Sequence, residues 1–554
     1  MKSTALIILA ASKIRQDYMS VFKTMPAMIP FNGKPLVYHI ILNSINSGME
    51  GPVVVALPES ETHVEQFLRS AFGRRLDIHF CYISEAKPNC QADSLKQCLA
   101  YMKEQSIEDC GAIVANGDIY FELPSQAIKV NYPIAFISNM PYSEKYSGFN
   151  YVDGELKFVP KGSVAESQNQ STKIDCGVYS LPSWSSVLSF GDPKDNYYQL
   201  SVGEFLVSIF GNQIQLEELS RWEDLGNLNS ATKISTKVLG AREFNSLQID
   251  EKKGLISKSS RKREKILQEI NYYLKLPKQL SIYFPRLYDF NLGVNTSYSI
   301  EYYPYKTLSE YFVMYELPMS CWESIFNKIF DIYSDFTVVR GERPNFEQYA
   351  GMYTKKLHTR MNMLQNNKVL SELVKADYVW INNKKYFGWS YYLPKIEKLV
   401  RGHFQTSECS VIHGDLCFSN ILYEPTTNII KLIDPRGEFY SEGVFGDPDY
   451  DLAKLMHSVL GGYDYILHQM YILDGGVESG FSFSLIQSHY AMQVKELFTK
   501  KLYQQYNLQK LDVLLVFEAM LFLSMLPLHS DDLKRQTAFY LTAVEILNSI
   551  ESIN

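Results

Sequence analysis

The feature that most constrains this chain is a polar loop between two apolar runs, at residues 411–422. The loop contains His413-Gly414-Asp415, and Asn420 follows five residues after Asp415. A second apolar run ends at Asp434. Short β-branched runs predict buried strands, so these polar side chains are expected at strand ends. Phosphoryl transfer from ATP requires a carboxylate that accepts the hydroxyl proton, together with Asn and Asp side chains that hold Mg²⁺. The pattern therefore predicts Asp415 as the catalytic base and Asn420 and Asp434 as metal ligands.

Composition limits the partners and the compartment. A chain of 554 residues exceeds one core, so two or more domains are expected. The net charge of −7 argues against nucleic acid as a partner. None of the eight cysteines forms a CxxC pair, which is typical of reduced thiols in a cytoplasmic protein. The apolar run at 514–528 contains Glu518 and predicts a core helix, not a membrane span.

Residues 1–240 have the pattern of an α/β domain. Apolar runs at 5–11, 53–57 and 112–115 predict buried strands, and helical patterns lie between them. Such alternation indicates a largely parallel sheet, whose ligands bind beyond the carboxyl ends of the strands. Asp118 directly follows the third run, and Asp224 follows Trp222 much later. Both are expected to hold a divalent metal on a nucleotide, although a turn or cap role is the alternative for each.

This part of the chain resembles the sugar-nucleotidyltransferase family, which includes phosphocholine cytidylyltransferases. The resemblance rests on five motifs: Ile8-Leu9-Ala10-Ala11, Asn32-Gly33-Lys34-Pro35-Leu36-Val37, Gln91-Ala92-Asp93-Ser94, Gly117-Asp118 and Trp222-x-Asp224-x-Gly226. It implies a Rossmann-like domain that binds CTP or another NTP with Mg²⁺. It further implies that Arg15 contacts the triphosphate and that Lys161 contacts the sugar phosphate.

Two departures from the family pattern bear on activity. The first loop, at residues 11–15, has no glycine, and Pro26-Ala27 stands where the family carries a catalytic lysine. Without the positive charge of a lysine beside the transferred phosphate, the transition state loses a few kcal/mol of stabilisation. Two interpretations stay open: Lys13 or Lys23 takes over the role, or the domain only binds its ligand.

Residues 241–554 begin with a pattern of two strands and a basic helix, at 244–249, 253–260 and 261–276. Lys258 at the end of the second strand is expected to contact nucleotide phosphates, oriented by a glutamate of the helix. Glu269 is the expected partner, and Glu264 is its rival. The alternative is that Lys258 is one of several surface lysines.

The same residues resemble the aminoglycoside phosphotransferase / choline kinase family. The resemblance rests on His413-Gly414-Asp415-x4-Asn420, on Ile433-Asp434 and on the segment from Gly446 to Leu455. It implies a two-lobed protein-kinase-like fold that uses ATP and Mg²⁺. Within that segment, Asp451 is expected to hold the catalytic loop, and Asp447 to cap a helix or approach the substrate. Arg436 is expected to stabilise phosphate charge or to pair with Glu438 or Asp447.

The two resemblances together predict a bifunctional kinase and nucleotidyltransferase. Its expected substrate is a small hydroxylated sugar, polyol or amino alcohol, and its expected product is an activated precursor for a bacterial capsule or lipopolysaccharide. The alternative is an ATP-dependent kinase with an inactive nucleotide-binding or scaffold domain. An antibiotic kinase would need an acidic pocket, for which Glu438, Glu442, Asp447 and Asp449 are the candidates. A protein kinase is disfavoured because no activation segment follows Asp434. A homo-oligomer is compatible with the sequence.

Overall fold

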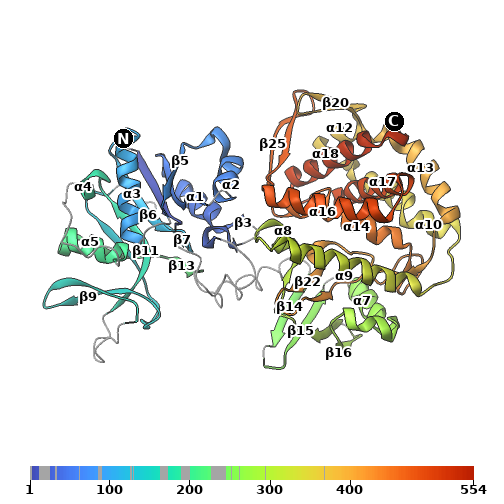
Figure 1. The fold of residues 1–554 in the computed structure, drawn as a ribbon, viewed down its shortest axis with the longest axis horizontal. Coiled ribbons are helices and arrows are strands. Elements are labelled where there is room, and N and C mark those ends of the chain that lie inside the picture. The colour runs from blue at the N-terminus through green and yellow to red at the C-terminus, as the bar shows by residue number, and fades with distance from the viewer. Residues whose placement is uncertain are drawn as a thin grey trace. The chain divides into compact units, whose positions relative to one another are not determined.

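The computed structural model describes residues 3–11, 25–31, 34–60, 63–84, 90–124, 128, 130–162, 172–188, 200–225, 245–250, 252–260, 263–293, 295–366 and 368–553. The chain divides into two compact units, Met1–Thr236 and Lys237–Asn554 (Figure 1). Each unit is described by itself. Arg15, Lys13, Lys23, Asn32 and Gly33 lie outside the described residues.

The N-terminal unit is built on one large sheet with helices packed against it. Its main strands are β1 (Thr4–Leu9), β4 (Val53–Pro58), β5 (Ile78–Ile83), β6 (Gly111–Asn116), β7 (Ile119–Glu122), β8 (Ile134–Ser138), β9 (Gly148–Val152), β10 (Glu155–Val159), β11 (Lys173–Leu181), β12 (Gln215–Glu218) and β13 (Arg221–Asp224). Its helices are α1 (Leu36–Asn46), α2 (His63–Phe72), α3 (Gln91–Glu104), α4 (Ser185–Leu188) and α5 (Val202–Phe210).

The sheet is mixed, which corrects the prediction of a largely parallel sheet. Its order is β10-β9-β11-β6-β1-β4-β5, and β8 and β12 join through β11. The predicted strands β1, β4 and β6 are parallel, as is β5. However, β11 runs antiparallel to both β6 and β8, and β9 runs antiparallel to β10. Strands β9 and β10 form a hairpin, whereas β11 pairs with β6 and β8 across long stretches of the chain.

The parallel half carries the core of this unit. All six residues of β1 are buried, and the apolar side chains of β1, β4 and β6 pack with those of α3 and α5. A strand buried on both faces reads as a continuous apolar run, which is why the sequence reveals these strands clearly. The carboxyl ends of β1 and β6 lie side by side, with Leu9 paired to Asn116.

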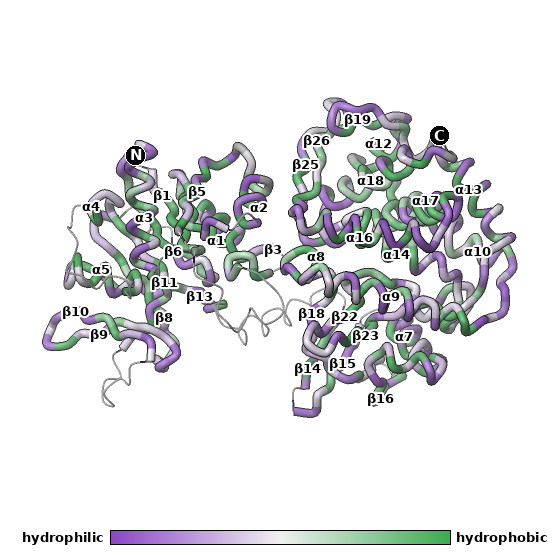
Figure 2. Tube along the Cα trace, viewed as in Figure 1, coloured by the Kyte–Doolittle hydropathy of each residue, from purple (hydrophilic) through white to green (hydrophobic). Residues whose placement is uncertain are grey.

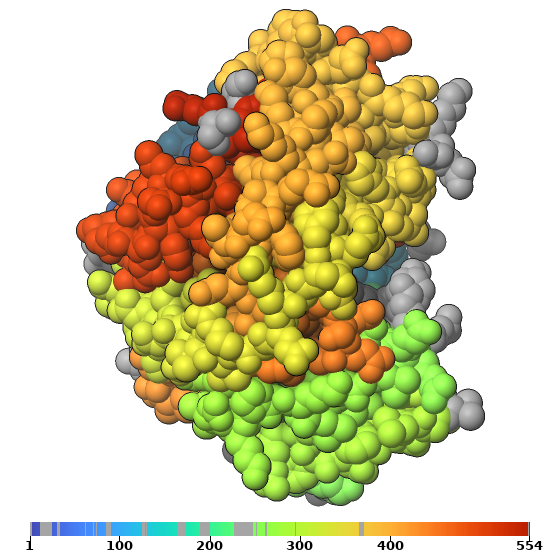
Figure 3. Space-filling model, turned by 90° about the vertical axis from the view of Figure 1, so that its right-hand side faces the viewer, coloured from blue at the N-terminus to red at the C-terminus, as the bar shows by residue number. Residues whose placement is uncertain are grey.

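The C-terminal unit begins with a small antiparallel sheet and one helix. The sheet has the order β14-β15-β17-β16, formed by Asn245–Asp250, Leu255–Ser260, Ser297–Glu301 and Leu287–Asn291 respectively. Helix α7 (Arg263–Lys275) packs on β15 and β17 through Ile266 and Ile270. Figure 3 shows this segment in light green, below the mainly helical remainder in yellow to red.

The rest of the C-terminal unit is mainly helical. Its helices are α8 (Leu308–Val313), α9 (Met319–Val338), α10 (Phe346–Met352), α11 (Thr354–Asn362), α12 (Lys368–Lys375), α13 (Trp389–Thr406), α14 (Pro448–Val459), α15 (Tyr463–Leu467), α16 (His489–Gln505), α17 (Leu508–Met525) and α18 (Leu533–Ser549). Its strands are β18 (Lys306–Thr307), β19 (Tyr378–Ile381), β20 (Lys384–Phe387), β21 (Ser410–Val411), β22 (Ile421–Glu424), β23 (Ile429–Leu432), β24 (Phe445–Gly446), β25 (Tyr471–Gly476) and β26 (Gly480–Leu485).

Helix α17 is the centre of this helical core. It packs against α11, α14 and α18, and Figure 2 colours most of it as hydrophobic. The stretch Leu508–His529 is long and apolar enough to cross a membrane, with a mean hydropathy of 2.0, but 67% of its most apolar window is buried by neighbouring helices. This packing is what a core helix requires, as the sequence pattern predicts for this stretch.

Candidate active sites

Lys258 lies between two carboxylates in the C-terminal unit. Its ammonium is 2.9 Å from Oε2 of Glu269 on α7 and 2.8 Å from Oδ1 of Asp434. Glu264 is exposed and takes no part in this arrangement. Burial alone would lower the pKa of Lys258, but Asp434 and Glu269 outweigh it and raise the pKa. Lys258 therefore stays charged although its side chain is only 6% exposed.

A buried carboxylate fixes the shape of the loop after β21. Asp451 of α14 accepts hydrogen bonds from the backbone N–H groups of His413 and Gly414, at 2.6 and 2.7 Å. Gly414 has a φ of +76°, and a Cβ there would lie 1.9 Å from the Phe439 ring, so only glycine fits. The expected role of Asp451 as the support of this loop agrees with these contacts.

His413 is a packing residue of the loop. It is fully buried, and burial lowers its pKa to about 4, so its imidazole is neutral. Its Nδ1 accepts from the backbone N–H of Asp415 at 3.3 Å, and its Nε2 donates to the Ile433 carbonyl at 3.0 Å. His413 thus joins the Asp415 loop to the strand that leads to Asp434.

Asp415 and Asn420 lie together at the open end of this loop. The Asn420 amide Nδ2 donates to Oδ2 of Asp415 at 3.1 Å and to its backbone carbonyl at 2.9 Å. These bonds turn the Asn420 Oδ1 atom away from Asp415. The Asp415 side chain is 38% exposed, so its carboxylate is accessible to a substrate hydroxyl.

Asp434 occupies a strained backbone position beside Lys258. Its φ is +56°, in the left-handed region that non-glycine residues rarely adopt. Its side chain is 40% exposed. The following turn approaches α7 closely, because a Cβ on Gly437 would lie 1.8 Å from the Gln268 carbonyl oxygen. Strain of this kind is often found where a side chain is held for binding or catalysis.

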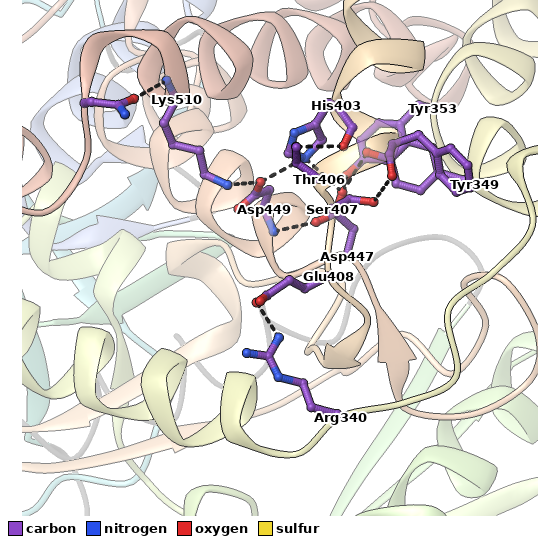
Figure 4. Close-up of polar contacts among 12 residues, drawn as sticks. Arg340, Tyr349, Tyr353, His403, Thr406, Ser407, Glu408, Asp447, Asp449 and Lys510 are labelled. Atoms are coloured by element: carbon purple, nitrogen blue, oxygen red, sulfur yellow. Dashed lines mark hydrogen bonds and ion pairs between the residues drawn. The ribbon is translucent and has the colours of Figure 1, made fainter.

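Asp447 and Asp449 belong to a neutral buried cluster (Figure 4). His403 Nε2 is 2.9 Å from Asp449 and 3.5 Å from Asp447, and Lys510 also pairs with Asp449. Tyr349 and Tyr353 donate to Asp447, which also caps α14 by accepting from the Asp449 N–H. Two cations already neutralise the two carboxylates, so the cluster offers no charge for a metal ion or a polycationic substrate.

The other two acidic candidates contact α7. Gln268 donates to Glu438, and Asn271 donates to Glu442 at 3.3 Å. Arg436 is exposed, and within the described part of the chain no carboxylate lies within 4.0 Å of its guanidinium. The predicted pairing of Arg436 with Glu438 or Asp447 is therefore wrong, which leaves the other expectation, that Arg436 faces phosphate charge.

In the N-terminal unit, the structure brings Asp118 and Asp224 together. Asp118 lies in the turn between β6 and β7, and Asp224 ends β13. The two strands pair antiparallel, with Asp224 opposite Ile119, and the Leu225 N–H donates to the Asp118 carbonyl at 3.0 Å. The Trp222 indole anchors β13 by donating to the Cys176 carbonyl at 2.9 Å. Two partly buried aspartates thus lie at adjacent strand ends, and carboxylate oxygens are the ligands that Mg²⁺ takes.

The remaining predicted residues of this unit stand apart. Lys161 is exposed in the turn after β10, and in the described ranges no contact joins it to Asp118 or Asp224. Ala27 lies in the short 3-10 helix Pro26–Met28 and is 1% exposed. Its neighbours Met25 and Met28 are buried as well, so buried apolar side chains occupy the segment where the resembled family carries a lysine.

Sequence reasoning gave no role to Lys454. This residue of α14 is one turn beyond Tyr450, and its Nζ is 2.8 Å from Oδ1 of Asp415. Burial would lower the pKa of Lys454, but the Asp415 carboxylate and neighbouring groups raise it. Its position three residues after Asp451 on the same helix could have indicated this contact, because that spacing places Lys454 on the side of the helix that faces the loop.

Comparison with protein families matches residues 21–240 to the nucleotidyl transferase family. The N-terminal unit is therefore a nucleotidyltransferase-type domain, which confirms this part of the predicted resemblance. The chain as a whole is a mixed α/β protein.

Among curated proteins, a probable ketoamine kinase of Lactiplantibacillus plantarum is 30% identical over 144 residues, which are 26% of this chain and 44% of that relative. The match thus spans less than half the length of the relative.

Two solved structures cover 43% of the chain each. A putative glucose-1-phosphate thymidylyltransferase from Bacillus anthracis has 17% identity and a TM-score of 0.34, with 95% of its own chain covered. HddC from Yersinia pseudotuberculosis, complexed with GMP-PN, has 19% identity and a TM-score of 0.33, with 99% covered.

Proposed function

We propose that the C-terminal unit transfers the γ-phosphate of ATP to a hydroxyl group of a small molecule. The observation that carries this proposal is the joining of Lys258, Glu269 and Asp434 by two ion pairs, close to a half-exposed Asp415. Lysine oriented by a glutamate, with an aspartate beside it, is the arrangement that holds nucleotide phosphates in the kinase fold. The likeness to a probable ketoamine kinase supports the same class of reaction.

Each residue has a role that its surroundings permit. Asp415 accepts the proton of the acceptor hydroxyl, and Lys258 neutralises nucleotide phosphate charge. The oxygens of Asn420 and Asp434 fit Mg²⁺, which prefers carboxylate and carbonyl ligands and would neutralise phosphate charge when bound. The Asn420 amide already faces Asp415, so its Oδ1 is free to turn toward a cation. Arg436, exposed two residues beyond Asp434, stabilises the transferred phosphoryl group.

For the whole chain we propose two successive reactions. The kinase unit forms a phosphate ester, and the nucleotidyltransferase-type unit couples that ester to a nucleotide with release of pyrophosphate. Asp118 and Asp224 would hold the metal that accompanies CTP or another NTP. The product is an activated precursor for a capsule or lipopolysaccharide, made in the cytoplasm. The second candidate, a binding or scaffold role for the N-terminal unit, is favoured by the apolar burial of Ala27.

Purified full-length protein tests both reactions. With ATP and Mg²⁺, we expect ADP formation with at least one member of a panel of choline, ethanolamine, glycerate, hexoses and heptoses. Asp415→Ala and Asp434→Ala should abolish it, and unchanged turnover in either variant would refute the mechanism. The kinase product is then supplied with CTP, UTP, GTP, dTTP or ATP. If none gives pyrophosphate, the N-terminal unit has the binding role.

A further inference from the structure

Four cationic side chains lie around Tyr450 and form what we call the basic cluster: Lys356, Arg360, Arg436 and Lys454. Lys356 and Arg360 are one turn apart on α11, so they share a face of that helix. Lys454 comes from α14, and Arg436 from the turn after Asp434. Residues from three separate segments thus converge on Tyr450, and Lys454 connects them to the proposed catalytic base.

Tyr450 lies at the centre of the basic cluster. Lys356 donates to its hydroxyl at 2.9 Å, and Tyr450 is one helical turn before Lys454, which contacts Asp415 at 2.8 Å. Arg360 and Arg436 are both close enough to act electrostatically on one another and on Tyr450. A cavity of about 10 Å³, the size of one water molecule, lies beside Lys356 and Tyr450 and is also lined by Met352, Phe517 and Met520.

The basic cluster contains more cationic side chains than there are carboxylates paired with them. Asp415 pairs with Lys454, but Lys356, Arg360 and Arg436 have no carboxylate within 4.0 Å in the part of the chain that the structure describes. Burial and the neighbouring cations lower the pKa of Lys356 and of Arg360. Like charges gathered in a partly buried place destabilise one another unless an anion joins them. This arrangement favours an anionic ligand.

We propose that the basic cluster, chiefly through Lys356 and Arg360, binds an anionic group of the phosphoryl acceptor, which is therefore a hydroxylated molecule that also carries a carboxylate or a phosphate. The inference rests on the proposed kinase function, because it takes Asp415 as the group that faces the acceptor hydroxyl. It excludes a purely cationic acceptor such as an amino alcohol, which these side chains would repel.

A different ligand for the basic cluster would be the nucleotide itself. Lys258 and Asp434 already provide the nucleotide side of the site, and they lie on the side of the sheet and α7. Lys356 and Arg360 come instead from α11, beside α14 and Asp415. The acceptor side is therefore the better assignment, and the Michaelis constant for ATP separates the two.

The experiment uses full-length protein and acceptors that differ in one charged group. Glycerol is compared with glycerate and glycerol 3-phosphate, and glucose with glucuronate and glucose 6-phosphate, at constant ionic strength. We expect ADP formation with a kcat/KM at least about tenfold higher for a charged member than for its neutral partner. The carboxylate and phosphate members show which anion is used. In parallel, the same compounds are tested for thermal stabilisation of the protein.

Variants then connect the effect to the basic cluster. In Lys356→Gln and Arg360→Gln, the KM for the charged acceptor should rise about tenfold while the KM for ATP stays within about twofold. Lys355→Gln, on the same helix but exposed and paired with Glu347, is the matched control and should change neither. A rise in the KM for ATP alone would assign the basic cluster to the nucleotide and overturn the proposal.

Failure of this inference is distinct from failure of the kinase proposal. If neutral or cationic acceptors are phosphorylated as well as the charged ones and Asp415→Ala stops the reaction, the kinase stands and the inference is wrong. If no acceptor is turned over, stabilisation by the charged compounds that is lost in Lys356→Gln supports the binding site. No stabilisation of the natural protein by any charged member overturns it.

Discussion

The ammonium of Lys454 lies 2.8 Å from Oδ1 of Asp415, and the two residues come from different segments of the C-terminal unit. Asn420 contacts the other carboxylate oxygen, Oδ2, at 3.1 Å. The carboxylate is therefore held from both sides while its edge is half-exposed. For a group that must receive a proton at a defined position, such orientation contributes directly to the rate.

Lys454→Met should lower the turnover number of the kinase reaction about tenfold, because Asp415 loses its orientation and its neutralising charge. The Michaelis constant for ATP should change little, since Lys454 does not contact Lys258 or Asp434. Steady-state ADP formation measures both. Lys500→Met, at an exposed position, serves as the control. Unchanged turnover would show that Asn420 alone positions the carboxylate.

Removal of Lys258 should destabilise the C-terminal unit. Glu269 is only 2% exposed, and Lys258→Met leaves it buried beside Tyr298, which donates to it at 2.7 Å, with the exposed Lys265 at 3.6 Å as its remaining cation. Breaking a buried pair in this way costs about 3–5 kcal/mol. The double variant Lys258→Met/Glu269→Gln should recover part of that loss, although ATP binding stays absent. Calorimetric unfolding tests this, with Lys253→Met in the exposed turn as the reference. Equal stability of both variants would contradict the ion-pair account.

Tyr450 should ionise at an unusually low pH. Its burial would raise the pKa, but Lys356, Lys454 and Arg436 outweigh burial and lower the pKa of Tyr450 to about 8. Because the folded pKa is below the unfolded one, this ionisation stabilises the protein above about pH 10 and the gain disappears as the pH falls through about 8. Ultraviolet absorbance should show a tyrosinate between about pH 7 and 9 that Tyr450→Phe lacks. Binding of an anionic acceptor should raise the midpoint.

His403 should make stability depend on pH in the opposite sense. Burial would lower its pKa, but Asp447 and Asp449 raise it to about 9. The folded pKa is above the unfolded one, so the stabilisation is fully present below about pH 6.5 and is lost as the pH rises through about 9. The shift corresponds to about 3 kcal/mol. Melting temperatures of the natural protein and of His403→Asn should differ at pH 6 and converge at pH 10; a constant difference would refute this.

Asp118 and Asp224 should bind a divalent cation together. Mn²⁺ as a substitute for Mg²⁺ allows binding to be measured by electron paramagnetic resonance, whether or not nucleotidyl transfer occurs. With CTP present, Asp118→Asn and Asp224→Asn should each weaken Mn²⁺ binding about tenfold or more, since each removes one carboxylate ligand. Asp153→Asn, in an exposed turn, is the control. Unaltered binding in both variants would assign these residues to the turn.

The sequence was informative where local pattern and chemistry coincide. The apolar runs of β1, β4 and β6 are buried on both faces, so each run can be recognised as a strand from its own short segment of sequence. Lys258 and Glu269 are close in the sequence, on a strand and on the helix that follows it, which made their pairing predictable. The loop at Asp415 carries a dense set of polar residues with fixed spacing.

Contacts between distant segments could not be predicted in this way. Lys356 and Arg360 lie in an ordinary helical pattern, and only the packing of α11 against α17 brings them near Tyr450. The antiparallel direction of β11 depends on which strands pair across long loops, a choice that local propensity does not determine. From the sequence alone, Asp447 and Asp449 could be assigned to a ligand site, because the sequence does not show that His403 and Lys510 pair with them.

The pairing of β7 with β13 has a consequence for how the protein is made. Domains form as units during synthesis, in order from the N-terminus. Asp118 is synthesised early, but Asp224 belongs to the last described strand of the unit, so the two residues come together only when β13 joins β7. A chain whose synthesis stops before this strand would lack Asp224, so the proposed metal-binding pair would be incomplete. The site is thus a late product of translation, assembled just as the C-terminal unit begins to emerge.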